Sequence, residues 1–420
     1  MENRSAPSPL FAAGLVGALI LCLAAALPVR AQLILGQYED EAPLASWNVF
    51  GAVSAPSLGL GGIRIARAFD ASISTTNPAL LLTLPRSSAS LTGSYTVASL
   101  FRYSIVNTGV LGTTSNLSVG SFALETGAFA YRFGCWAVAF TADILENFAR
   151  PSVRSSYASG GTEVYAIGVE QSGVLRAWNA AVARRLGRRL SLGVGLNLVE
   201  GRLDRAVSEA WPRDGIAITD DKSERFRGYF VNAGLCAEIS PSVWVSLAGR
   251  TPYLRTADGT SLVRYEAPGT DIRIEAEARN EYRQPWVAGA GLYWRWSETW
   301  SLAADLTYFG WSRYSVVYFD EPLARDFRDV ATASIGVEHG IKGRLGGKAV
   351  LFPIRLGVAY DPQPMDNIHS SYLYLTLGAG IHLGPFAADL AGSIGHESGS
   401  GNALSAGRVA LGLSYAFDNR

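Results

Sequence analysis

The feature that most limits the fold is a strict two-residue alternation, which recurs along the chain after residue 87. From Arg408 to Phe417 every second residue is large and apolar, and the residues between are mostly small or polar. Side chains two residues apart share one face of a β-strand, so the pattern predicts a strand with one apolar face. The stretches 372–383 and 190–198 repeat it. The chain is therefore predicted to be all-β.

The polar faces of these strands favour a membrane protein over a soluble sandwich. They carry Gly, Ser and Thr more often than Lys or Glu. Only 17% of the residues are charged, against about a quarter in a typical soluble domain. A chain in lipid must pair all of its backbone groups, which for strands requires a closed barrel. We therefore expect a transmembrane antiparallel β-barrel.

Short and long connections alternate along the barrel region. Short turns are predicted near residues 134, 187–189, 240–241, 297–298, 340–348 and 384–385. Longer polar loops are predicted at 105–116, 149–161, 205–223, 255–283, 320–328, 363–371 and 399–406. This arrangement predicts about fourteen strands, an even number that is typical of outer-membrane barrels. Aromatic residues at expected strand ends predict interface girdles, with core packing as the alternative: Trp286, Trp294, Trp296, Trp300, Tyr308, Phe309 and Trp311.

The N-terminus is typical of a targeting segment. Arg4 precedes an apolar run from Leu10 to Leu27, and Ala31 offers a small residue for cleavage. This predicts a secretory signal peptide at 1–31, with an uncleaved anchor helix as the alternative. Alternation is poor from 32 to 86 and strong from 87 to 420, so we expect a separate N-terminal segment at 32–86 followed by the barrel at 87–420. The expected location is the outer membrane of a Gram-negative-type cell.

Charge and reactive residues argue against several function classes. Lys+Arg and Asp+Glu are both 36, so nothing points to nucleic acid. Cys135 and Cys236 make neither a disulfide framework nor a zinc pair. The histidines show no metal-ligand spacing and no GxSxG motif occurs, so we expect no enzyme, cofactor or metal. A lipase that uses His382 or His396 is the alternative that the sequence leaves open.

Three segments together resemble the long-chain fatty-acid transporter (FadL) family, which includes outer-membrane uptake proteins for toluene. The first is the Gly-rich stretch from Ser57 to Ser72 followed by Asn77-Pro78-Ala79. The second runs from Trp300 to Ser312, and the third from Ile354 to Pro362. The resemblance implies that residues 32–86 form an N-terminal hatch (plug) inside a fourteen-stranded barrel. It also implies that the protein takes up long-chain fatty acids or hydrocarbons by passive, ligand-gated diffusion. The ligand is not specified by the sequence.

The resemblance also implies functional residues. In the family the Asn-Pro-Ala triplet belongs to the hatch, so Asn77, Pro78 and Ala79 are the best candidates, although a rigid turn would also explain them. Gly59, Gly61 and Gly62 suit a gating switch or, equally, tight packing against the wall. Possible lumen charges, which either pair with one another or are solvated, are Arg64, Arg67, Asp70 and Arg355. Arg355 is a candidate for binding a carboxylate, with a wall ion pair as the alternative.

The resemblance further implies binding partners and a route by which the ligand leaves the barrel. Expected partners are a hydrophobic small molecule, outer-membrane lipid and lipopolysaccharide, and the barrel assembly machinery, with the protein itself a monomer. Lateral release in the family depends on a kinked third strand. The third strand expected here, Cys135 to Phe148, has no internal Gly or Pro, which argues against that route. A structural or secretion-associated barrel without solute transport is the alternative function.

Overall fold

A computed structural model describes residues 50–104, 114–323, 326–366, 369–399 and 405–417. The predicted signal peptide and the hatch residues before 50 lie outside this range. No helix among the described residues has the length and apolarity needed to cross a membrane.

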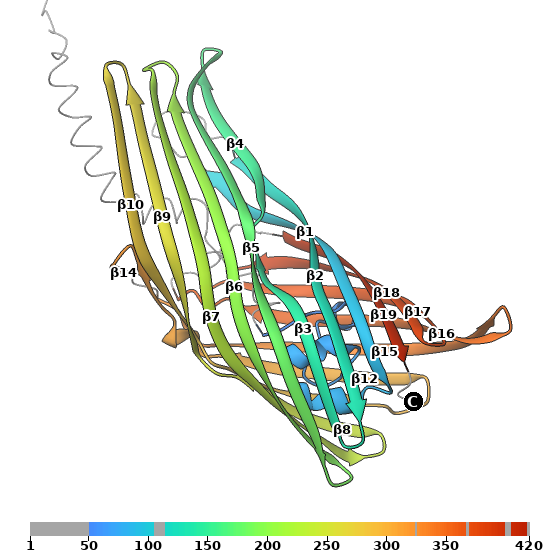
Figure 1. The fold of residues 1–420 in the computed structure, drawn as a ribbon. Coiled ribbons are helices and arrows are strands. Elements are labelled where there is room, and N and C mark those ends of the chain that lie inside the picture. The colour runs from blue at the N-terminus through green and yellow to red at the C-terminus, as the bar shows by residue number, and fades with distance from the viewer. Residues whose placement is uncertain (1–49, 105–113, 324–325, 367–368, 400–404, 418–420) are drawn as a thin grey trace, which may run out of the picture. The chain divides into compact units, whose positions relative to one another are not determined.

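One antiparallel sheet closes on itself to form the barrel (Figure 1). Its first strand pairs with its last, from Ser87 opposite Phe417 to Ala98 opposite Ala406. The sheet has 19 strand segments, but β3 and β4, β8 and β9, and β10 and β11 are each one interrupted strand. β13 and β14 form a small hairpin beside β10. Fourteen strands therefore make the closed wall, as the alternation predicts.

The segments have the following bounds: β1 Ser87–Ser104, β2 Thr114–Phe133, β3 Trp136–Asn147, β4 Arg150–Ser159, β5 Thr162–Leu186, β6 Leu190–Trp211, β7 Ile216–Ser240, β8 Val243–Arg250, β9 Tyr253–Ala267, β10 Thr270–Gln284, β11 Val287–Trp294, β12 Trp300–Phe309, β13 Ser315–Tyr318, β14 Glu321–Leu323, β15 Val330–Leu345, β16 Lys348–Pro362, β17 Ser371–Leu383, β18 Phe386–Ser398 and β19 Ser405–Phe417. We call the end of the barrel that carries the turns at 134–135, 187–189 and 384–385 the short-turn end, and the opposite end the hairpin end.

An uncharged apolar band surrounds the outside of the barrel next to the short-turn end. On β6 the outward side chains Leu192, Val194, Leu196 and Leu198 are all exposed, and Glu200 follows them. Five of the seven aromatic residues expected in girdles are exposed, whereas Phe309 and Trp311 are buried. Trp286 stacks on Tyr308 at one edge of the band, and Trp294, Trp296 and Trp300 cluster at the other. From Val287 to Trp294, β11 spans roughly 26 Å, close to the height of a membrane band.

The strands β4, β5, β6, β7, β9 and β10 continue far beyond the band on one side of the barrel (Figure 1). From Glu200 to Trp211, β6 extends by roughly 35 Å. The stretches 149–161, 205–223 and 255–283 were predicted as loops, and this prediction is wrong for most of their length. They form β4, the ends of β6 and β7, and the β9–β10 hairpin. Their outward side chains are charged because they project beyond the apolar band, so the apolar alternation is lost while the ladder continues.

The third strand is interrupted, against the expectation of an unkinked strand. β3 ends at Asn147, and β4 begins at Arg150. The Asn147 side chain accepts a hydrogen bond from Ala149 N (3.0 Å), and Phe148 N donates to Gly173 O on β5 (3.0 Å). Pro151, just past the predicted strand, has no N–H to donate. The break therefore results from Asn147 and Pro151, near the end of β3, and from Gly173, which lies across from them on β5.

The interruption leaves a gap in the hydrogen bonding of the wall. The β2–β3 ladder stops where Thr126 lies opposite Asp143. Beyond that point β2 pairs with β1, and β4 pairs with β5. No ladder among the described residues joins β2 to β4. We call this opening the β2–β3 gap.

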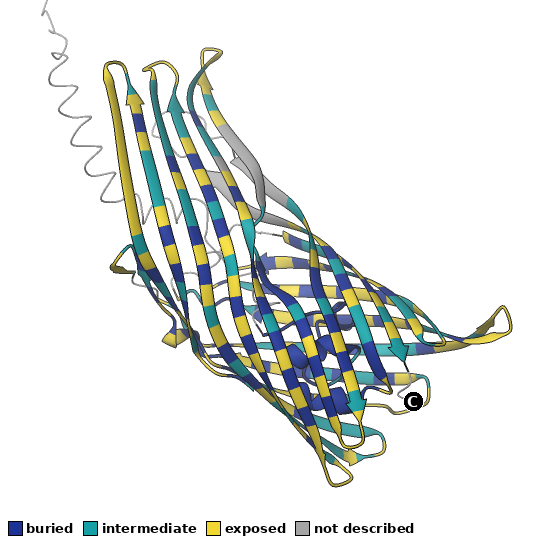
Figure 2. Ribbon diagram, in the orientation of Figure 1, coloured by how far each residue is buried: buried dark blue, intermediate teal, exposed yellow. Residues whose placement is uncertain are grey.

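The hatch lies inside the barrel, as Figure 2 shows. It contains α3 (Ala55–Gly59) and the 3-10 helices η1 (Ala71–Thr75) and η2 (Pro78–Thr83). α3 packs against β16 to β19, whereas η2 packs against β5, β6 and β7. Nearly every residue from 50 to 82 is buried. The hatch therefore fills the barrel at the level of the apolar band.

Candidate functional site

The Asn-Pro-Ala triplet lies against two glycines of the wall. A Cβ at Gly193 on β6 would lie 2.5 Å from Ala79 N, and a Cβ at Gly234 on β7 would collide with the Asn77 side chain. Asn77 is fully buried, and its Nδ2 donates to Ile65 O within the hatch (3.2 Å). The wall can hold this turn because glycine leaves the space that a side chain would fill.

Three buried asparagines beside this turn join the wall to the hatch. Asn179, Asn197 and Asn232 face the lumen from β5, β6 and β7. Asn179 Nδ2 donates to Asn197 Oδ1 (3.0 Å), and Asn197 Nδ2 donates to Asn232 Oδ1 (2.8 Å). Asn232 Nδ2 in turn donates to Ser74 O of the hatch (2.9 Å). This asparagine ladder fixes the hatch to one side of the wall.

The glycine-rich loop after α3 lies against the other side. Gly61 and Gly62 have positive φ, which favours glycine. Gly61 N donates to Thr376 Oγ1 on β17 (2.9 Å), and that hydroxyl donates to Gly59 O (3.1 Å). Wall glycines again face the hatch backbone, since a Cβ at Gly336 would lie 2.5 Å from Leu60 O. The loop is thus packed tightly against the wall in this structure.

The carboxylate of Asp305 on β12 accepts hydrogen bonds from three consecutive residues of the hatch. Its carboxylate accepts from the backbone N–H groups of Arg64 (2.7 Å), Ile65 (2.8 Å) and Ala66 (2.8 Å). Successive N–H groups that point to one place form an anion-binding concavity, and here the anion is a wall side chain. Gly291 makes room, because a Cβ there would lie 2.8 Å from Asp305 Oδ1.

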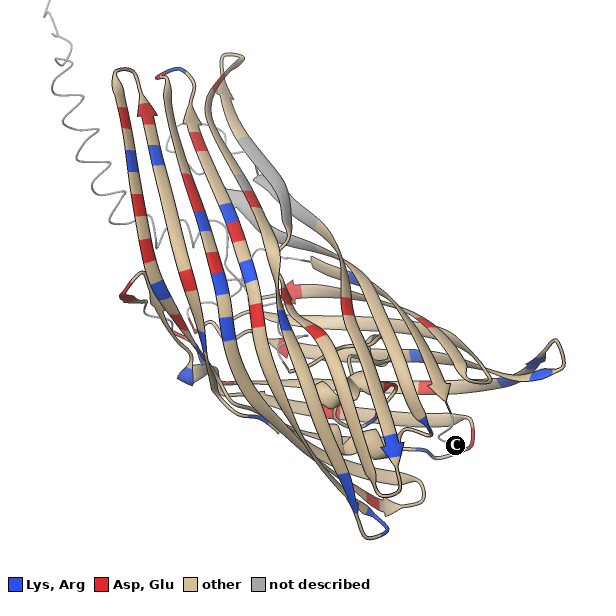
Figure 3. Ribbon diagram, in the orientation of Figure 1, with Lys and Arg blue, Asp and Glu red and all other residues tan. Residues whose placement is uncertain are grey.

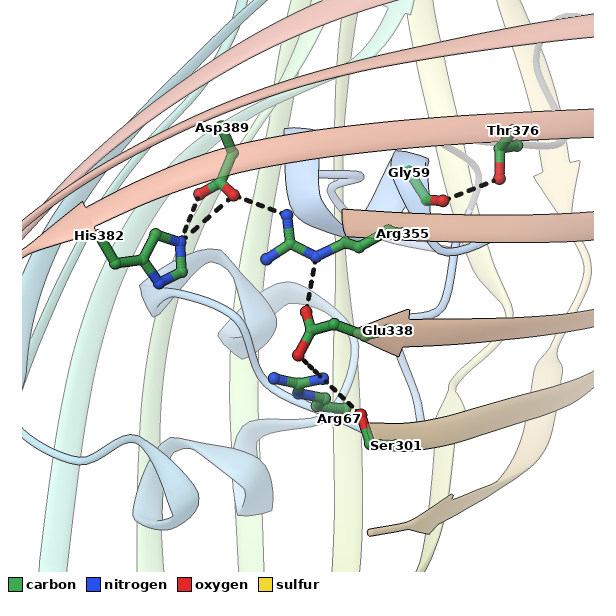
Figure 4. Close-up of polar contacts among 8 residues, drawn as sticks. All are labelled: Gly59, Arg67, Ser301, Glu338, Arg355, Thr376, His382 and Asp389. Carbon is green, nitrogen blue, oxygen red and sulfur yellow. Dashed lines mark hydrogen bonds and ion pairs between the residues drawn. The ribbon is translucent and has the colours of Figure 1, made fainter. Parts of the chain in front are cut away.

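A chain of ionisable side chains extends from the hatch across the four wall strands β15 to β18 (Figure 4). Arg67 of the hatch pairs with Glu338 on β15 (2.9 Å), and Glu338 also pairs with Arg355 on β16 (2.7 Å). Arg355 then pairs with Asp389 on β18 (2.6 Å), which lies 3.3 Å from His382. Arg355 is 1% exposed, so both of its acidic partners are needed to compensate its buried charge.

The other predicted lumen charges have local roles. Asp70 caps η1 by accepting from Ser72 N (2.9 Å). Burial raises the pKa of the Asp70 carboxyl, although the hydrogen bonds from Ser72 oppose this shift. The Arg64 guanidinium donates to Gly51 O (3.4 Å) within the hatch, and burial lowers its pKa to about 10. Both residues therefore organise the hatch itself.

A group of aromatic side chains lines the lumen on the hairpin side of the hatch. We call the following residues the lumen aromatic cluster: Phe148, Phe226, Phe230, Tyr253 and Tyr282, with Arg250 and Arg255. Along β7 the inward residues run from Gly234 at the hatch to Asn232, Phe230 and Phe226. Phe226 lies 5.6 Å from Phe148 and 5.8 Å from Tyr282, between ring centroids.

The arginines of this cluster lie over its rings. The Arg255 guanidinium is 5.0 Å from the Phe226 centroid and 4.7 Å from that of Tyr282, and it lies 3.8 Å from Glu146. Arg250 lies 5.3 Å from the centroids of both Phe230 and Tyr253. Aromatic faces and stacked guanidinium planes bind flat or extended apolar molecules by dispersion and cation–π contact. This part of the lumen therefore suits an apolar solute.

The sequence predicted the hatch side of these contacts better than the wall side. It singled out Asn77, Gly59, Arg67 and Arg355, which all lie at the hatch–wall interface or within its ion-pair chain. It missed Asp305, Thr376, the asparagine ladder and the lumen aromatic cluster. Their only signal is that polar or aromatic residues occupy lumen-facing positions of predicted strands, and a strand pattern alone does not show what lies inside the barrel.

The two histidines of the lipase alternative lie on neighbouring strands, His382 on β17 and His396 on β18. His382 faces Asp389, and His396 is exposed on β18. The described residues contain no group of three or more His, Cys, Asp or Glu residues that is arranged to hold a metal ion.

The sequence matches the profile of the family described as outer membrane protein transport protein (OMPP1/FadL/TodX) over residues 53–373. The solved structure of the toluene transporter TbuX of Ralstonia pickettii is 17% identical and has a TM-score of 0.62, covering 88% of this chain and 100% of that one. A Pseudomonas aeruginosa FadL homologue is 15% identical with a TM-score of 0.61, covering 88% and 99%. The toluene transporter TodX of P. putida is 12% identical with a TM-score of 0.62, covering 89% and 100%. No curated protein sequence matches significantly.

Proposed function

Because the chain belongs to the OMPP1/FadL/TodX family of outer membrane transport proteins, we propose that it takes up apolar small molecules by ligand-gated diffusion. The family sits in the outer membrane and transports hydrophobic compounds. Short turns of such barrels face the periplasm and long connections face the outside. The hairpin end is then the outer end, and the lumen aromatic cluster lies between the outside and the hatch.

The lumen aromatic cluster carries this proposal. Water-filled pores disfavour apolar solutes, whereas apolar walls bind them at roughly 0.8 kcal/mol per buried methylene. Arg255 already contacts Glu146, so the cluster offers aromatic surface more than a free positive charge. A toluene-like ring or an aliphatic chain fits this chemistry. The neighbours TbuX and TodX are toluene transporters by name, which supports an aromatic hydrocarbon as the first ligand to test.

Release of the ligand requires part of the hatch to move. We propose that Asn77, Pro78 and Ala79, with Gly59, Gly61 and Gly62, form the moving segment. Asn77 Oδ1 is buried and has no hydrogen-bond partner among the described residues. An unpaired buried acceptor costs about 1–3 kcal/mol, so the buried conformation of Asn77 is less stable than one in which Oδ1 is paired. The free energy needed to move Asn77 out of this position is lower by the same amount.

The β2–β3 gap offers an exit at the side of the barrel. Ile144, Leu145 and Phe148, which are buried, lie where the β2–β3 ladder has ended. The transfer free energy of an apolar solute is more favourable for entry into lipid than for entry into water. We propose that the solute leaves the lumen through this gap.

Ligand binding can be tested with toluene and oleate as probes. Phe226→Ala/Tyr282→Ala removes two rings of the lumen aromatic cluster, and we expect at least a tenfold loss of probe binding to the purified protein. Tyr229→Ala is the matched control, because Tyr229 lies on the same strand but is 69% exposed on the outside. Binding that is absent in the unaltered protein would refute uptake and favour a structural barrel.

The exit route needs a separate experiment. Leu145→Trp fills space at the β2–β3 gap, whereas Leu196→Trp adds the same ring on the lipid-facing side of β6. We expect Leu145→Trp to bind the probes normally but to slow their passage into lipid vesicles several-fold. Equal passage rates in both variants would exclude the gap as the exit.

A further inference from the structure

A buried carboxylate lies in the wall where the β2–β3 gap begins. Charged residues are sparser on the strands around the hatch than on the projecting strands (Figure 3). Asp143 on β3 is an exception, and only 2% of it is exposed. It lies opposite Thr126 in the last pair of the β2–β3 ladder. Two residues earlier, Thr141 Oγ1 lies 2.8 Å from Ser74 Oγ of the hatch, so this face of β3, and with it the Asp143 side chain, points into the lumen.

One oxygen of this carboxylate has no hydrogen-bond partner in the part of the chain that the structure describes. Asp143 Oδ1 accepts from Thr126 Oγ1 (3.1 Å), and the backbone N–H of Ile144 also interacts with the carboxylate. Oδ2 is buried and accepts no hydrogen bond from any described residue. Because an unpaired buried acceptor costs free energy, a donor from outside the chain is favoured at this position.

The surroundings of Asp143 favour a neutral donor over a charged one. Arg64 of the hatch lies close enough to interact electrostatically with the Asp143 carboxylate. Its positive charge repels an ammonium group at the same place. A carboxylate ligand is disfavoured as well, because it adds a second acidic group and brings no donor. A hydroxyl group meets both conditions, since it donates one hydrogen bond and carries no charge.

Apolar side chains lie directly beyond this carboxylate. Leu145 is buried two residues further along β3, which is roughly 7 Å along the strand. Phe148 of the lumen aromatic cluster follows three residues later. On the β2 side of the gap, the Glu125 carboxylate is already paired with Arg408. An aromatic ring that packs against Leu145 can thus place a hydroxyl group at Asp143, where an acceptor oxygen is available.

We propose that Asp143 binds the hydroxyl group of an apolar solute at the entrance to the β2–β3 gap, so that the protein prefers phenols and alcohols to hydrocarbons of the same shape. This inference rests on the proposed uptake function and names its substrate class. A site that hydrogen-bonds a ligand hydroxyl discriminates strongly against the analogue that lacks it, because the buried group of the protein is then left unpaired. The preference therefore arises at one atom, Asp143 Oδ2.

The test compares three ligands of similar shape. Toluene has no polar group, p-cresol adds a hydroxyl to the same ring, and 4-methylanisole keeps the oxygen but cannot donate. Their dissociation constants are measured by calorimetry for the unaltered protein, for Asp143→Leu and for Asp143→Asn. Asp220→Leu is the matched control, because Asp220 is a buried carboxylate on the inward face of β7 that already pairs with Lys222 (3.1 Å). A gel shift of the unheated barrel verifies that each variant folds.

We expect the ratio of the toluene to the p-cresol dissociation constant to fall about tenfold in Asp143→Leu. The fall should be smaller in Asp143→Asn, because an amide oxygen still accepts a hydrogen bond. The ratio should stay unchanged in Asp220→Leu, and 4-methylanisole should not share the advantage of p-cresol.

Three results would overturn the inference: an unchanged ratio in Asp143→Leu, an equal fall in Asp220→Leu, or binding of 4-methylanisole as tight as that of p-cresol. An unchanged ratio would mean that water alone pairs with Oδ2. If toluene and p-cresol both bind but their ratio does not depend on Asp143, only this inference fails. If neither ligand binds the unaltered protein, the proposed uptake function fails with it.

Discussion

At the residue scale, the contacts that matter most are those in which one wall side chain satisfies several hatch groups. Asp305 satisfies three N–H groups, and Thr376 bonds both Gly59 and Gly61. These are ordinary polar residues at lumen-facing positions, so nothing in the sequence distinguishes them from a solvated channel lining. Only the placement of the hatch gives them a partner.

Removal of the Asp305 carboxylate should loosen the hatch. Asp305→Ala leaves three buried N–H groups without an acceptor, at about 1–3 kcal/mol each. We expect hydrogen exchange at Arg64, Ile65 and Ala66 to accelerate by at least a hundredfold while the barrel stays folded. Asp329→Ala, which removes a carboxylate outside the lumen, serves as the control. Unchanged exchange at these three amides would show that Asp305 does not hold the hatch.

The hatch should also respond to pH through Asp70. Burial raises the pKa of this carboxyl above its ordinary 3.8, so folding favours the neutral form. Its contribution to hatch stability is fully present below pH 3.8 and is lost as the pH rises through the raised pKa. We expect the protection factor of the Ser72 amide to fall as the pH rises above 3.8, and to change less in Asp70→Asn. A rise in protection over this range would contradict the assignment.

At the scale of elements, the alternation predicted the number of strands and most short turns, because both follow from the two-residue period and from turn chemistry. The lengths of the strands on one side were not predictable in the same way. In 205–223, for example, the inward face carries buried charged residues such as Arg205 and Asp220, and the outward face lies beyond the apolar band. The apolar signal therefore disappears while hydrogen bonding continues. The break after Asn147 is not predictable from the third strand alone, because Pro151 follows that strand and Gly173 lies across from it on β5.

The outer part of the β9–β10 hairpin should be dispensable for folding. Residues 263–274 pair only within the hairpin and with β7, far from the ladders that close the barrel. Replacing them by Asn-Gly provides a two-residue hairpin turn between Leu262 and Glu275. We expect the shortened protein to keep the unheated gel shift and to lose less than about 2 kcal/mol of stability. Failure to form a barrel would mean that the hairpin takes part in closure.

At the scale of the whole molecule, the described barrel is a wall with two separate attachments for one hatch. The asparagine ladder on β5 to β7 holds η1 through Ser74, and Asp305 with the Arg67 ion-pair chain holds the earlier hatch segment against β12 to β18. A segment attached at two sides blocks the lumen unless one attachment opens. We therefore expect the barrel to be closed to ions while both attachments are intact.

Deletion of the hatch should convert the protein into an open pore. The fourteen-stranded ladder does not include residues 50–84, so the barrel is expected to assemble without them. Its lumen then exposes polar groups such as Asn197 and Asp305 to water. We expect steady ion conductance in planar bilayers from the deletion variant and nearly none from the full chain. Equal conductance of the two proteins would show that the hatch does not seal the lumen.

The glycines of the inner wall match the hatch residue by residue. A Cβ would strike or crowd hatch atoms at every one of these positions: Gly193, Gly234, Gly289, Gly291, Gly336, Gly357, Gly378 and Gly412. A larger residue at any of these wall positions thus demands a change in a hatch segment that is distant in the sequence, and the two regions must mutate together. A chimera that carries the hatch of a relative will hold it in place only if it also inherits the matching set of small wall residues, so hatch and wall are inherited as one unit.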